Sequence, residues 1–517
     1  MNREQTKMTG IRKGLDINRS EHEAISVRDN DKEDTDEGGH SKIAHMQEQQ
    51  SLITELRHNR VIRSKVILSI CATFVYAMLG WCKGQTGPAF LDILYISGTD
   101  LEKGSAFMTS YSTGSAIGSI IGGSFYSKGN RYLLLVVALA IYSLTRALIP
   151  WCVLYELMIT AHLAHGICAG VINVVVLSVA ISIWGATSRG RVYLNMFLLS
   201  DSAAGLISPM VTSPFLLPRT KDIVMHNGPR NSTVATTSTF IMEGNAATAN
   251  ATTNSNIIQI EMPVSNVYIA YSISAGLAFL VTLPFIVLCA KWPKNGTKRS
   301  VNEVPHFLGN LPLTIKRLQL LNVGIFSTFY MAVYFIFTGY LPAFCVEHLR
   351  WTKASGAWLM SVVYFAMLGG RICGTYLAHF FKPMKMLVLS TFLHVVGLVG
   401  LSVSGVFLAD VGIWISVCVI GIALGFTWPS LLSWTNENLI PVRGKVTAFI
   451  LLMGSAGTLS SPLLFGYMME EVSPIWFCFL NLGKTCITIV NVLLMFVYTR
   501  SVSSKSRMEQ NNKHSDS

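Results

Sequence analysis

Charged residues are scarce in this sequence. Asp, Glu, Lys and Arg make up 13% of its 517 residues, and 51% of the residues are hydrophobic. Soluble globular domains carry roughly 25% charged residues, so this chain has too few to cover a water-facing surface. The composition therefore excludes an ordinary soluble protein and favours one embedded in a lipid bilayer.

Motifs for hydrolysis or nucleotide binding are also missing. The sequence has no HExxH motif, no Walker loop with its Lys and no GxSxG motif. The cysteines are dispersed in apolar stretches without CxxC spacing, which favours small buried side chains over disulfides or a metal site. We therefore expect no enzyme activity, no metal and no cofactor, with a sodium ion or a proton as the possible coupling ion.

Long apolar stretches are what the sequence has in place of charge. A helix needs about 20 apolar residues to cross the roughly 30 Å hydrocarbon core of a membrane. Twelve stretches of about this length are predicted to span it, at 66–92, 104–127, 132–151, 154–183, 191–216, 267–290, 320–344, 356–381, 386–409, 411–435, 446–469 and 475–499.

The polar segments predict the topology. Residues 1–65 are polar and mixed in charge, which predicts a disordered cytoplasmic tail, without a removable signal peptide. If this tail is cytoplasmic, most Lys and Arg residues between spans fall in connections on the cytoplasmic side. The second tail, at 500–517, is then cytoplasmic as well. The net charge of +12 is then a basic membrane surface and does not indicate nucleic acid. The segment 217–266 becomes an extracellular loop, glycosylated at Asn231 and Asn250.

An internal repeat divides the chain into two halves. Gly166-Ile-Cys-Ala-Gly170 recurs as Gly421-Ile-Ala-Leu-Gly425, and two further short matches follow in the same order. The alternative is that glycine-rich helices resemble one another because small residues let helices pack closely. The ordered matches favour two parallel six-helix bundles, 66–290 and 320–499, joined by a cytoplasmic linker at 291–319, with a substrate site at their interface.

Charged or polar residues deep inside the spans are candidates for substrate or ion binding. Asp201 lies about ten residues into the fifth span, near the membrane midplane at about 1.5 Å per residue. His165 and Asn173 share one face of the fourth span. Asp201 could be a cation or proton ligand, with His165 as its neighbour or as a partner for a sugar hydroxyl. The alternative is a structural hydrogen-bond network between helices.

Lys83, in the outer half of the first span, allows several interpretations. It could attract an anionic substrate, or pair with Asp92 or Asp201. Snorkelling towards the outer headgroups is the simpler interpretation and the one we favour from sequence. The same interpretation applies more strongly to Arg146 and Lys484, because the third and last spans are often peripheral.

Aromatic and polar residues share faces of the seventh and tenth spans. Tyr330 and Tyr334 lie one turn apart, and Trp428 is followed in its span by Asn436 and Glu437. Such faces suit a neutral polyol, which needs stacking on its C–H faces and hydrogen bonds to its hydroxyls. The same residues could also serve ordinary helix packing.

The repeat and the basic inner loops resemble the major facilitator superfamily over about residues 66–500. The superfamily's signature between the second and third spans is kept at Gly122 and Arg131, whereas Tyr126 replaces its aspartate. The resemblance implies an all-α membrane protein with twelve transmembrane helices in two pseudo-symmetric six-helix bundles, the major facilitator fold. It also implies gating roles for Gly122, Arg131, Arg371 and Arg443.

Several stretches are similar to the sodium-dependent glucose transporter 1 family, of the major facilitator domain-containing 4 type. The most specific is Gly87-Pro-Ala-Phe-Leu-Asp-Ile93, and others are Trp184-Gly185 and Gly205 to Pro209. This similarity implies a hexose carrier at the plasma membrane, coupled to sodium. Its partners would be a small-molecule substrate and membrane lipid, and we expect a monomer.

Two other functions compete with a sugar carrier. Lys83 and Arg371 favour a carrier of organic anions or monocarboxylates, although the acidic opening typical of monocarboxylate carriers is absent from the first span. Tyr126 favours a receptor or scaffold that keeps the fold and no longer transports.

Overall fold

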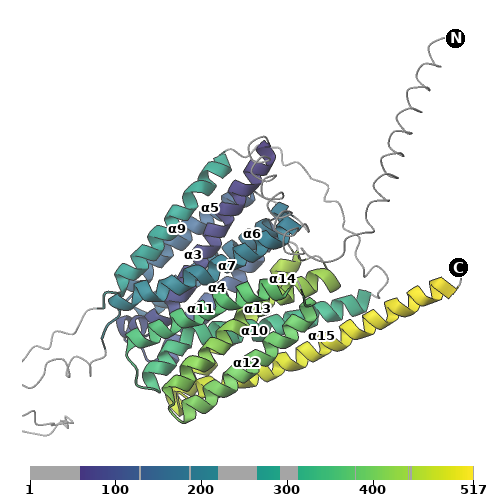
Figure 1. Ribbon diagram of the computed structural model, residues 1–517. Helices are drawn as coiled ribbons and strands as arrows, with labels where there is room; N and C mark the ends of the chain where they lie inside the picture. Colours follow the sequence, from purple (N-terminus) through teal and green to yellow (C-terminus); the bar gives the residue numbers. More distant parts are fainter. Residues whose placement is uncertain are drawn as a thin grey trace, which may run out of the picture. The chain divides into compact units, whose positions relative to one another are not determined.

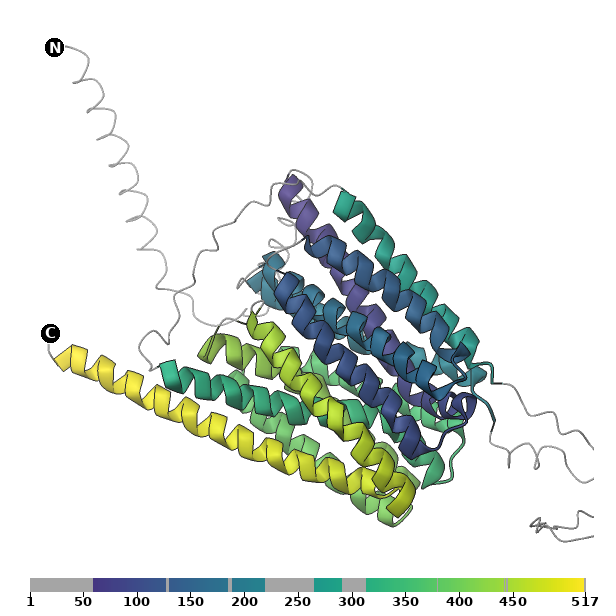
Figure 2. The ribbon, with the colours of Figure 1, turned by 180° about the vertical axis from the view of Figure 1, so that it is seen from behind.

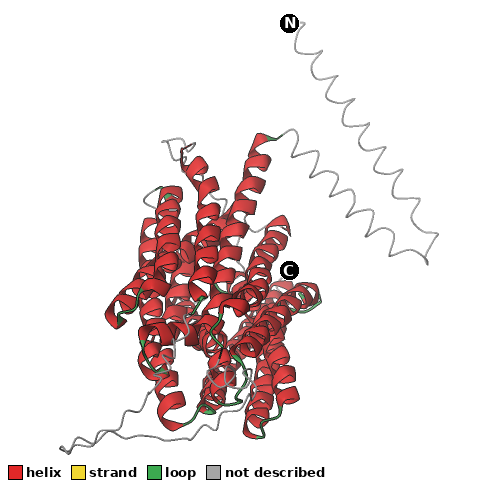
Figure 3. Ribbon diagram, turned by 90° about the vertical axis from the view of Figure 1, so that its left-hand side faces the viewer, coloured by secondary structure: helices red, strands yellow, loops and turns green. Residues whose placement is uncertain are grey.

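The computed structural model describes residues 59–126, 130–184, 188–218, 265–290, 313–378, 380–440, 442 and 445–515. Within these ranges the regular structure is helical and no strand occurs (Figure 3). The chain divides into a short unit, Met1–Val66, and a compact unit, Ile67–Ser517. Most of the predicted tail at 1–65 lies outside the described residues, as do the linker up to residue 312 and most of the predicted loop at 217–266.

Twelve long helices follow one another in the described ranges, in the places predicted for the twelve spans. The first six are α3 (Arg60–Ser97), α4 (Leu101–Phe125), α5 (Arg131–Leu148), α6 (Tyr155–Trp184), α7 (Ser188–Thr212) and α9 (Val267–Ala290). The second six are α10 (Leu313–Glu347), α11 (Lys353–Leu377), α12 (Pro383–Val406), α13 (Asp410–Asn438), α14 (Lys445–Tyr467) and α15 (Trp476–Ser515). Short 3₁₀ turns follow α5 and α7, and one π-helical turn, Met468–Val472, follows α14.

The largest differences from the predicted helix ends lie at three places. α3 begins at Arg60, α10 begins at Leu313, and α15 continues to Ser515 beyond its neighbours (Figure 2). The stretch 500–515 contains neither Gly nor Pro, so nothing in it stops the helix once the apolar span has ended. The predicted end of the last span therefore marks where the sequence stops being apolar, and the helix itself continues past it.

Ten of these helices are long and apolar enough to cross a membrane. Among the described helices the two that are not are α4 and α7, which are rich in Gly and Ser. Both pack against a helix of the other half, α4 on α14 and α7 on α11. Their lower apolarity is explained by these protein contacts, because a helix covered by other helices exposes less side-chain surface to lipid.

Equivalent helix contacts recur in the two halves, whose helices are labelled in Figure 1. In the first half α4 packs on α6, and α5 packs on α6 and α9. In the second half α11 packs on α13, and α12 packs on α13 and α15. The contacts between the halves follow the same rule, since α4–α14 and α11–α7 are equivalent pairs. The fold is thus two pseudo-symmetric six-helix bundles, as the sequence repeat predicts.

The repeated glycines mark equivalent close approaches between helices. A Cβ atom on Gly166 would lie 2.1 Å from the carbonyl oxygen of Tyr111, where α6 crosses α4. A Cβ atom on the equivalent Gly421 would lie 2.8 Å from the carbonyl oxygen of Val363, where α13 crosses α11. Real Cβ atoms do not come this close to backbone oxygens, so both crossings require glycine.

Gly166→Ala is expected to lower the melting temperature of the purified protein in detergent. The added methyl group has to push α6 away from α4, at a cost of about 1–3 kcal/mol. Gly276→Ala is the matched control, because no atom lies within 4 Å of a Cβ atom placed there. Equal melting temperatures for the two variants would show that the α4–α6 crossing does not depend on a glycine.

Candidate functional site

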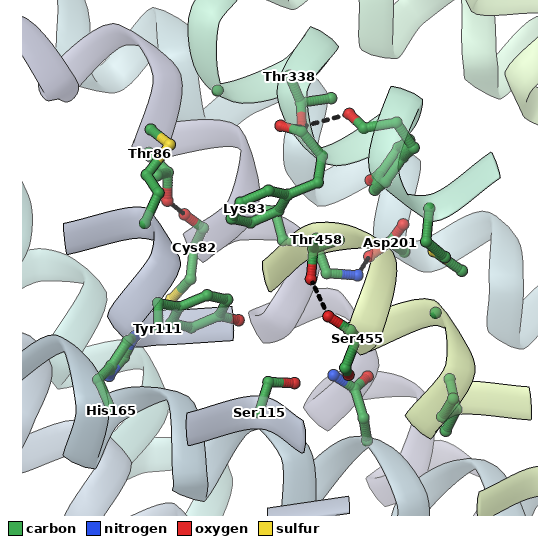
Figure 4. A pocket seen from close by; sticks show the side chains of 18 of the residues that line it. Cys82, Lys83, Thr86, Tyr111, Ser115, His165, Asp201, Thr338, Ser455 and Thr458 are labelled. Carbon is green, nitrogen blue, oxygen red and sulfur yellow. Dashed lines mark hydrogen bonds and ion pairs between the residues drawn. The ribbon is translucent and has the colours of Figure 1, made fainter. Parts of the chain in front are cut away.

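A cavity lies between the two halves of the compact unit, with a volume of about 190 Å³. Helices of both halves contribute to its walls, and its polar side chains come from widely separated parts of the chain (Figure 4). The predicted site residues that line it are Lys83, His165, Asn173 and Asp201 from the first half, and Tyr330, Tyr334, Arg371 and Trp428 from the second.

Asp201 on α7 is the charged centre of this cavity. Its side chain is 2% exposed, and Lys83 Nζ on α3 lies 2.9 Å from its Oδ1 atom. Arg371 Nη2 on α11 lies 3.3 Å from its Oδ2 atom, and the other Arg371 amino group donates a hydrogen bond to the carbonyl oxygen of Leu198. The carboxylate is therefore held by one cation from each half. Lys83 pairs with Asp201, so the snorkelling interpretation is wrong (Figure 4).

Close packing of α3 on α7 makes the Lys83–Asp201 pair possible. A Cβ atom on Gly80 would lie 2.1 Å from the carbonyl oxygen of Asp201, and one on Gly84 would lie 2.6 Å from that of Gly205. Two glycines one turn apart therefore bring the two backbones together. Lys83, on the same stretch of α3, then reaches the carboxylate with an extended side chain.

Arg146 on α5 is a second buried cation in the cavity wall, 4% exposed. One of its amino groups donates to Gln85 Oε1 at 2.6 Å and to the carbonyl oxygen of Cys82 at 3.2 Å. Its guanidinium carbon lies 4.2 Å from the centroid of the Tyr271 ring. The snorkelling interpretation of Arg146 is wrong, because α5 turns this residue towards α3 and α9.

His165 is held by α5 instead of Asp201. Its Nδ1 atom lies 3.0 Å from Thr145 Oγ1, and its ring stacks on Tyr142 with centroids 4.1 Å apart. The predicted partnership between His165 and Asp201 is not among its contacts. His165 does line the cavity, so a role as a hydrogen-bond partner for substrate stays a prediction.

Stacked aromatic rings of the second half form part of the cavity wall. Tyr330 stacks on Trp428 with centroids 6.0 Å apart and planes 9° apart, and also on Tyr334 at 6.5 Å. Across the interface, Tyr111 of α4 stacks on Phe335 of α10 at 6.1 Å. Such a wall offers flat apolar faces beside the charged centre.

Other predicted site residues lie away from the cavity or outside the described residues. Asn436 and Glu437 are exposed near the end of α13 and are not among the lining residues, and Asn436 Oδ1 accepts a hydrogen bond from the amide of Val442. Gly122 packs α4 against Val171 and Val174 of α6. Arg131 begins α5 and lies over the rings of Tyr126 and Tyr132. Arg443, Asn231 and Asn250 lie outside the described residues.

Several lining residues are not among those predicted for the site: Tyr76, Thr86, Tyr111, Ser115, Ser119, Arg146, Ser455 and Thr458. The spacing of some of these residues in the sequence could have indicated that they line a site. Tyr111, Ser115 and Ser119 follow one another at intervals of one helical turn on α4, which marks a polar face inside a span. Arg146 left only the general signal of a charge in hydrocarbon, without its direction.

A second ion pair joins the halves near the end of α3. Asp92 is fully buried, and Lys353 Nζ at the start of α11 lies 2.7 Å from its Oδ1 atom. Its Oδ2 atom accepts hydrogen bonds from the amide of Leu217 and from Ser265 Oγ. Asp92 belongs to the specific motif at residues 87–93, which gives that motif a structural role in closing this end of the interface.

Comparison with known proteins supports the same architecture. The family model of the Major Facilitator Superfamily matches residues 256–441. The sodium-dependent glucose transporter 1 of Homo sapiens is 22% identical over 459 residues, covering 86% of this chain and 82% of the relative. Major facilitator superfamily domain-containing protein 4A of Danio rerio is 23% identical over 481 residues, covering 84% and 88%.

Solved structures share the fold at low sequence identity. The xylose transporter XylE from E. coli superposes with a TM-score of 0.58 at 11% identity, covering 84% of this chain and 97% of that chain. The major facilitator transporter FucP in its outward conformation gives a TM-score of 0.54 at 14% identity, covering 84% and 99%. The helix arrangement is therefore that of the major facilitator fold.

The described helices form a multi-pass membrane protein with the major facilitator fold, and the chain is similar to the Major Facilitator Superfamily over residues 256–441. Over most of its length the chain is similar to the proteins named sodium-dependent glucose transporter 1 and to major facilitator superfamily domain-containing protein 4A.

Asp201→Asn is expected to destabilise the protein strongly. The change leaves Lys83 and Arg371 inside the protein without a carboxylate, and breaking a buried pair costs about 3–5 kcal/mol. The double variant Lys83→Met with Asp201→Asn should lose less than the sum of the two single variants, because one uncompensated cation is removed. Melting temperatures in detergent measure this, and additive losses would contradict the pairing.

Proposed function

We propose that the protein carries a hexose-class sugar across a membrane. The observation that carries the proposal is the cavity between the halves, where stacked aromatic rings lie beside hydroxyl and amide side chains. Aromatic faces suit the C–H faces of a pyranose ring, and the polar groups suit its hydroxyls. The names of the sequence relatives, which include glucose transporters, support the same substrate class.

Transport proceeds in this proposal by alternating access, with the two bundles rocking about the central cavity. Two ion pairs cross the interface, Asp201–Arg371 beside the cavity and Asp92–Lys353 near the end of α3. Each ion pair has to break when the two bundles move apart where that pair lies. The two ion pairs stabilise the arrangement in which the bundles are in contact at these positions, until substrate binding offsets the free energy lost when the pairs break.

Cation coupling through Asp201 is part of the proposal, with sodium or a proton as the coupling ion. In the described arrangement both carboxylate oxygens face cations, which disfavours a third cation there. Arg371 belongs to the other bundle and leaves when the bundles separate, whereas Lys83 stays. The carboxylate is then free on one side to accept the coupling ion.

The proposed setting is the plasma membrane, with both termini in the cytoplasm and the segment 217–266 outside. The distribution of Lys and Arg between spans supports this orientation. Leu217 and Ser265, at the two ends of that segment, both donate hydrogen bonds to Asp92 near the end of α3.

A carrier of organic anions or monocarboxylates is the second candidate. Lys83, Arg146 and Arg371 line the cavity against the single acid Asp201 among the described lining residues. An excess of positive charge in a low-dielectric site attracts an anionic solute.

Labelled substrate uptake into vesicles containing the full chain tests the function. We expect saturable hexose uptake that falls when sodium, or the proton gradient, is removed. Trp428→Ala should reduce uptake by about tenfold or more, because stacking on the sugar is lost. Trp414→Ala is the matched control, since Trp414 stacks on Trp351 away from the cavity lining.

The same assay separates the parts of the proposal. Ion stimulation that survives Asp201→Asn would show that Asp201 is not the ligand of the coupling ion. Uptake of lactate without hexose would replace the sugar carrier by the second candidate. Absence of flux for every substrate tested would favour a receptor or scaffold.

A further inference from the structure

The charges in the cavity do not balance for a neutral substrate. Its described lining residues include three permanent cations, Lys83, Arg146 and Arg371, and one acid, Asp201. Asp201 is shared by Lys83 and Arg371, so this trio keeps one positive charge in excess. Arg146 adds a second. A site that recognises only hydroxyl groups has no need of these charges.

Arg146 is the cation whose surroundings point to a missing anion. Its partners, Gln85 Oε1, the carbonyl oxygen of Cys82 and the ring of Tyr271, are all neutral. Its Nε atom is buried without a hydrogen-bond partner in the part of the chain that the structure describes. A buried charge without a counter-charge is costly, and an unsatisfied donor beside it adds to that cost.

The neighbours of Arg146 fix its position without neutralising it. Gln85 Oε1 also accepts a hydrogen bond from Ser274 Oγ at 2.7 Å, and Ser274 accepts one from Trp81 Nε1 at 2.9 Å. This chain of neutral groups joins α3, α5 and α9 and aligns the guanidinium. A guanidinium held in place presents its remaining donors in a planar fork, which matches a carboxylate.

We propose that the transported sugar is acidic, of the hexuronate class, and that Arg146 binds its carboxylate. The proposal rests on the hexose carrier proposed above and names its substrate more closely. The pyranose ring lies against the aromatic wall of Tyr330 and Trp428, and the carboxylate neutralises one of the two excess charges. An acidic sugar accounts both for the aromatic and hydroxyl-bearing cavity wall and for the excess positive charge, which by itself would favour a simple organic anion.

Vesicles containing the full chain test this with three labelled solutes: D-glucuronate, D-glucose and L-lactate. We expect glucuronate to be taken up at least about tenfold more efficiently than glucose, since a charged hydrogen-bonded pair exceeds a neutral one by that margin or more. Arg146→Gln should remove this preference by lowering glucuronate uptake at least about tenfold more than it lowers glucose uptake. Arg146→Lys should keep part of the preference, because the charge remains.

Lys484→Gln is the matched control. Lys484 is also a partly buried cation, but it binds Ser461 Oγ and the ring of Phe465 and is not among the lining residues of the cavity. It should leave the preference unchanged. If Arg146→Gln does not fold, thermal stabilisation of the unaltered protein decides the matter. Glucuronate should then raise the melting temperature at lower concentrations than glucose.

The outcomes distinguish the two proposals. Glucose uptake without glucuronate uptake, or a glucuronate preference that survives Arg146→Gln, overturns the assignment to Arg146 and leaves the hexose carrier standing. Lactate uptake without either sugar overturns both. Glucuronate uptake that depends on Arg146, with lactate excluded, supports both.

Discussion

The arrangement of the two bundles depends on one buried carboxylate. Asp201 is almost fully removed from solvent, and such a charge is tolerated only when cations compensate it. Lys83 supplies one cation from the same bundle and Arg371 supplies the other from the opposite bundle. The interface between the halves is therefore an electrostatic contact as well as a packed one.

The surrounding structure follows from the need to place these groups. Glycines let α3 approach α7 closely enough for Lys83 to reach Asp201, and α4 and α7 face the opposite bundle. The resulting cavity is lined by aromatic rings from both halves and by most of the charges from the first half. Lipid surrounds the apolar outer faces, so polar side chains turn inward, where a solute can use them.

The sequence predicts the fold well because the bilayer imposes simple rules on it. Span length, loop charge and the glycine repeat located twelve helices and two halves, including α4 and α7, whose own apolarity is low. Counting residues from the membrane surface also placed Asp201 at the right depth to line the cavity. The depth of a residue follows from its number of residues from the start of the span, so the sequence alone is enough to estimate it.

The direction in which a residue faces needs the rotation of its helix and the identity of its neighbour, which the sequence does not contain. Arg146 was therefore assigned to the lipid side, although α5 turns it towards Gln85. Lys83 could be listed with Asp92 and Asp201 as alternatives, but only packing decides between them. Asn436 and Glu437 share a helix with Trp428, yet they lie too near the end of α13 to reach the cavity.

The most direct measurement is the distance between spin labels at Lys103 and Val411, one on each half. Both positions are exposed, and the exposed native cysteines Cys373 and Cys486 would first be replaced. If the Asp201 contact holds the bundles together, Asp201→Asn will shift the distance distribution in vesicles towards a second, separated population. A distribution identical to that of the unaltered protein would contradict the account.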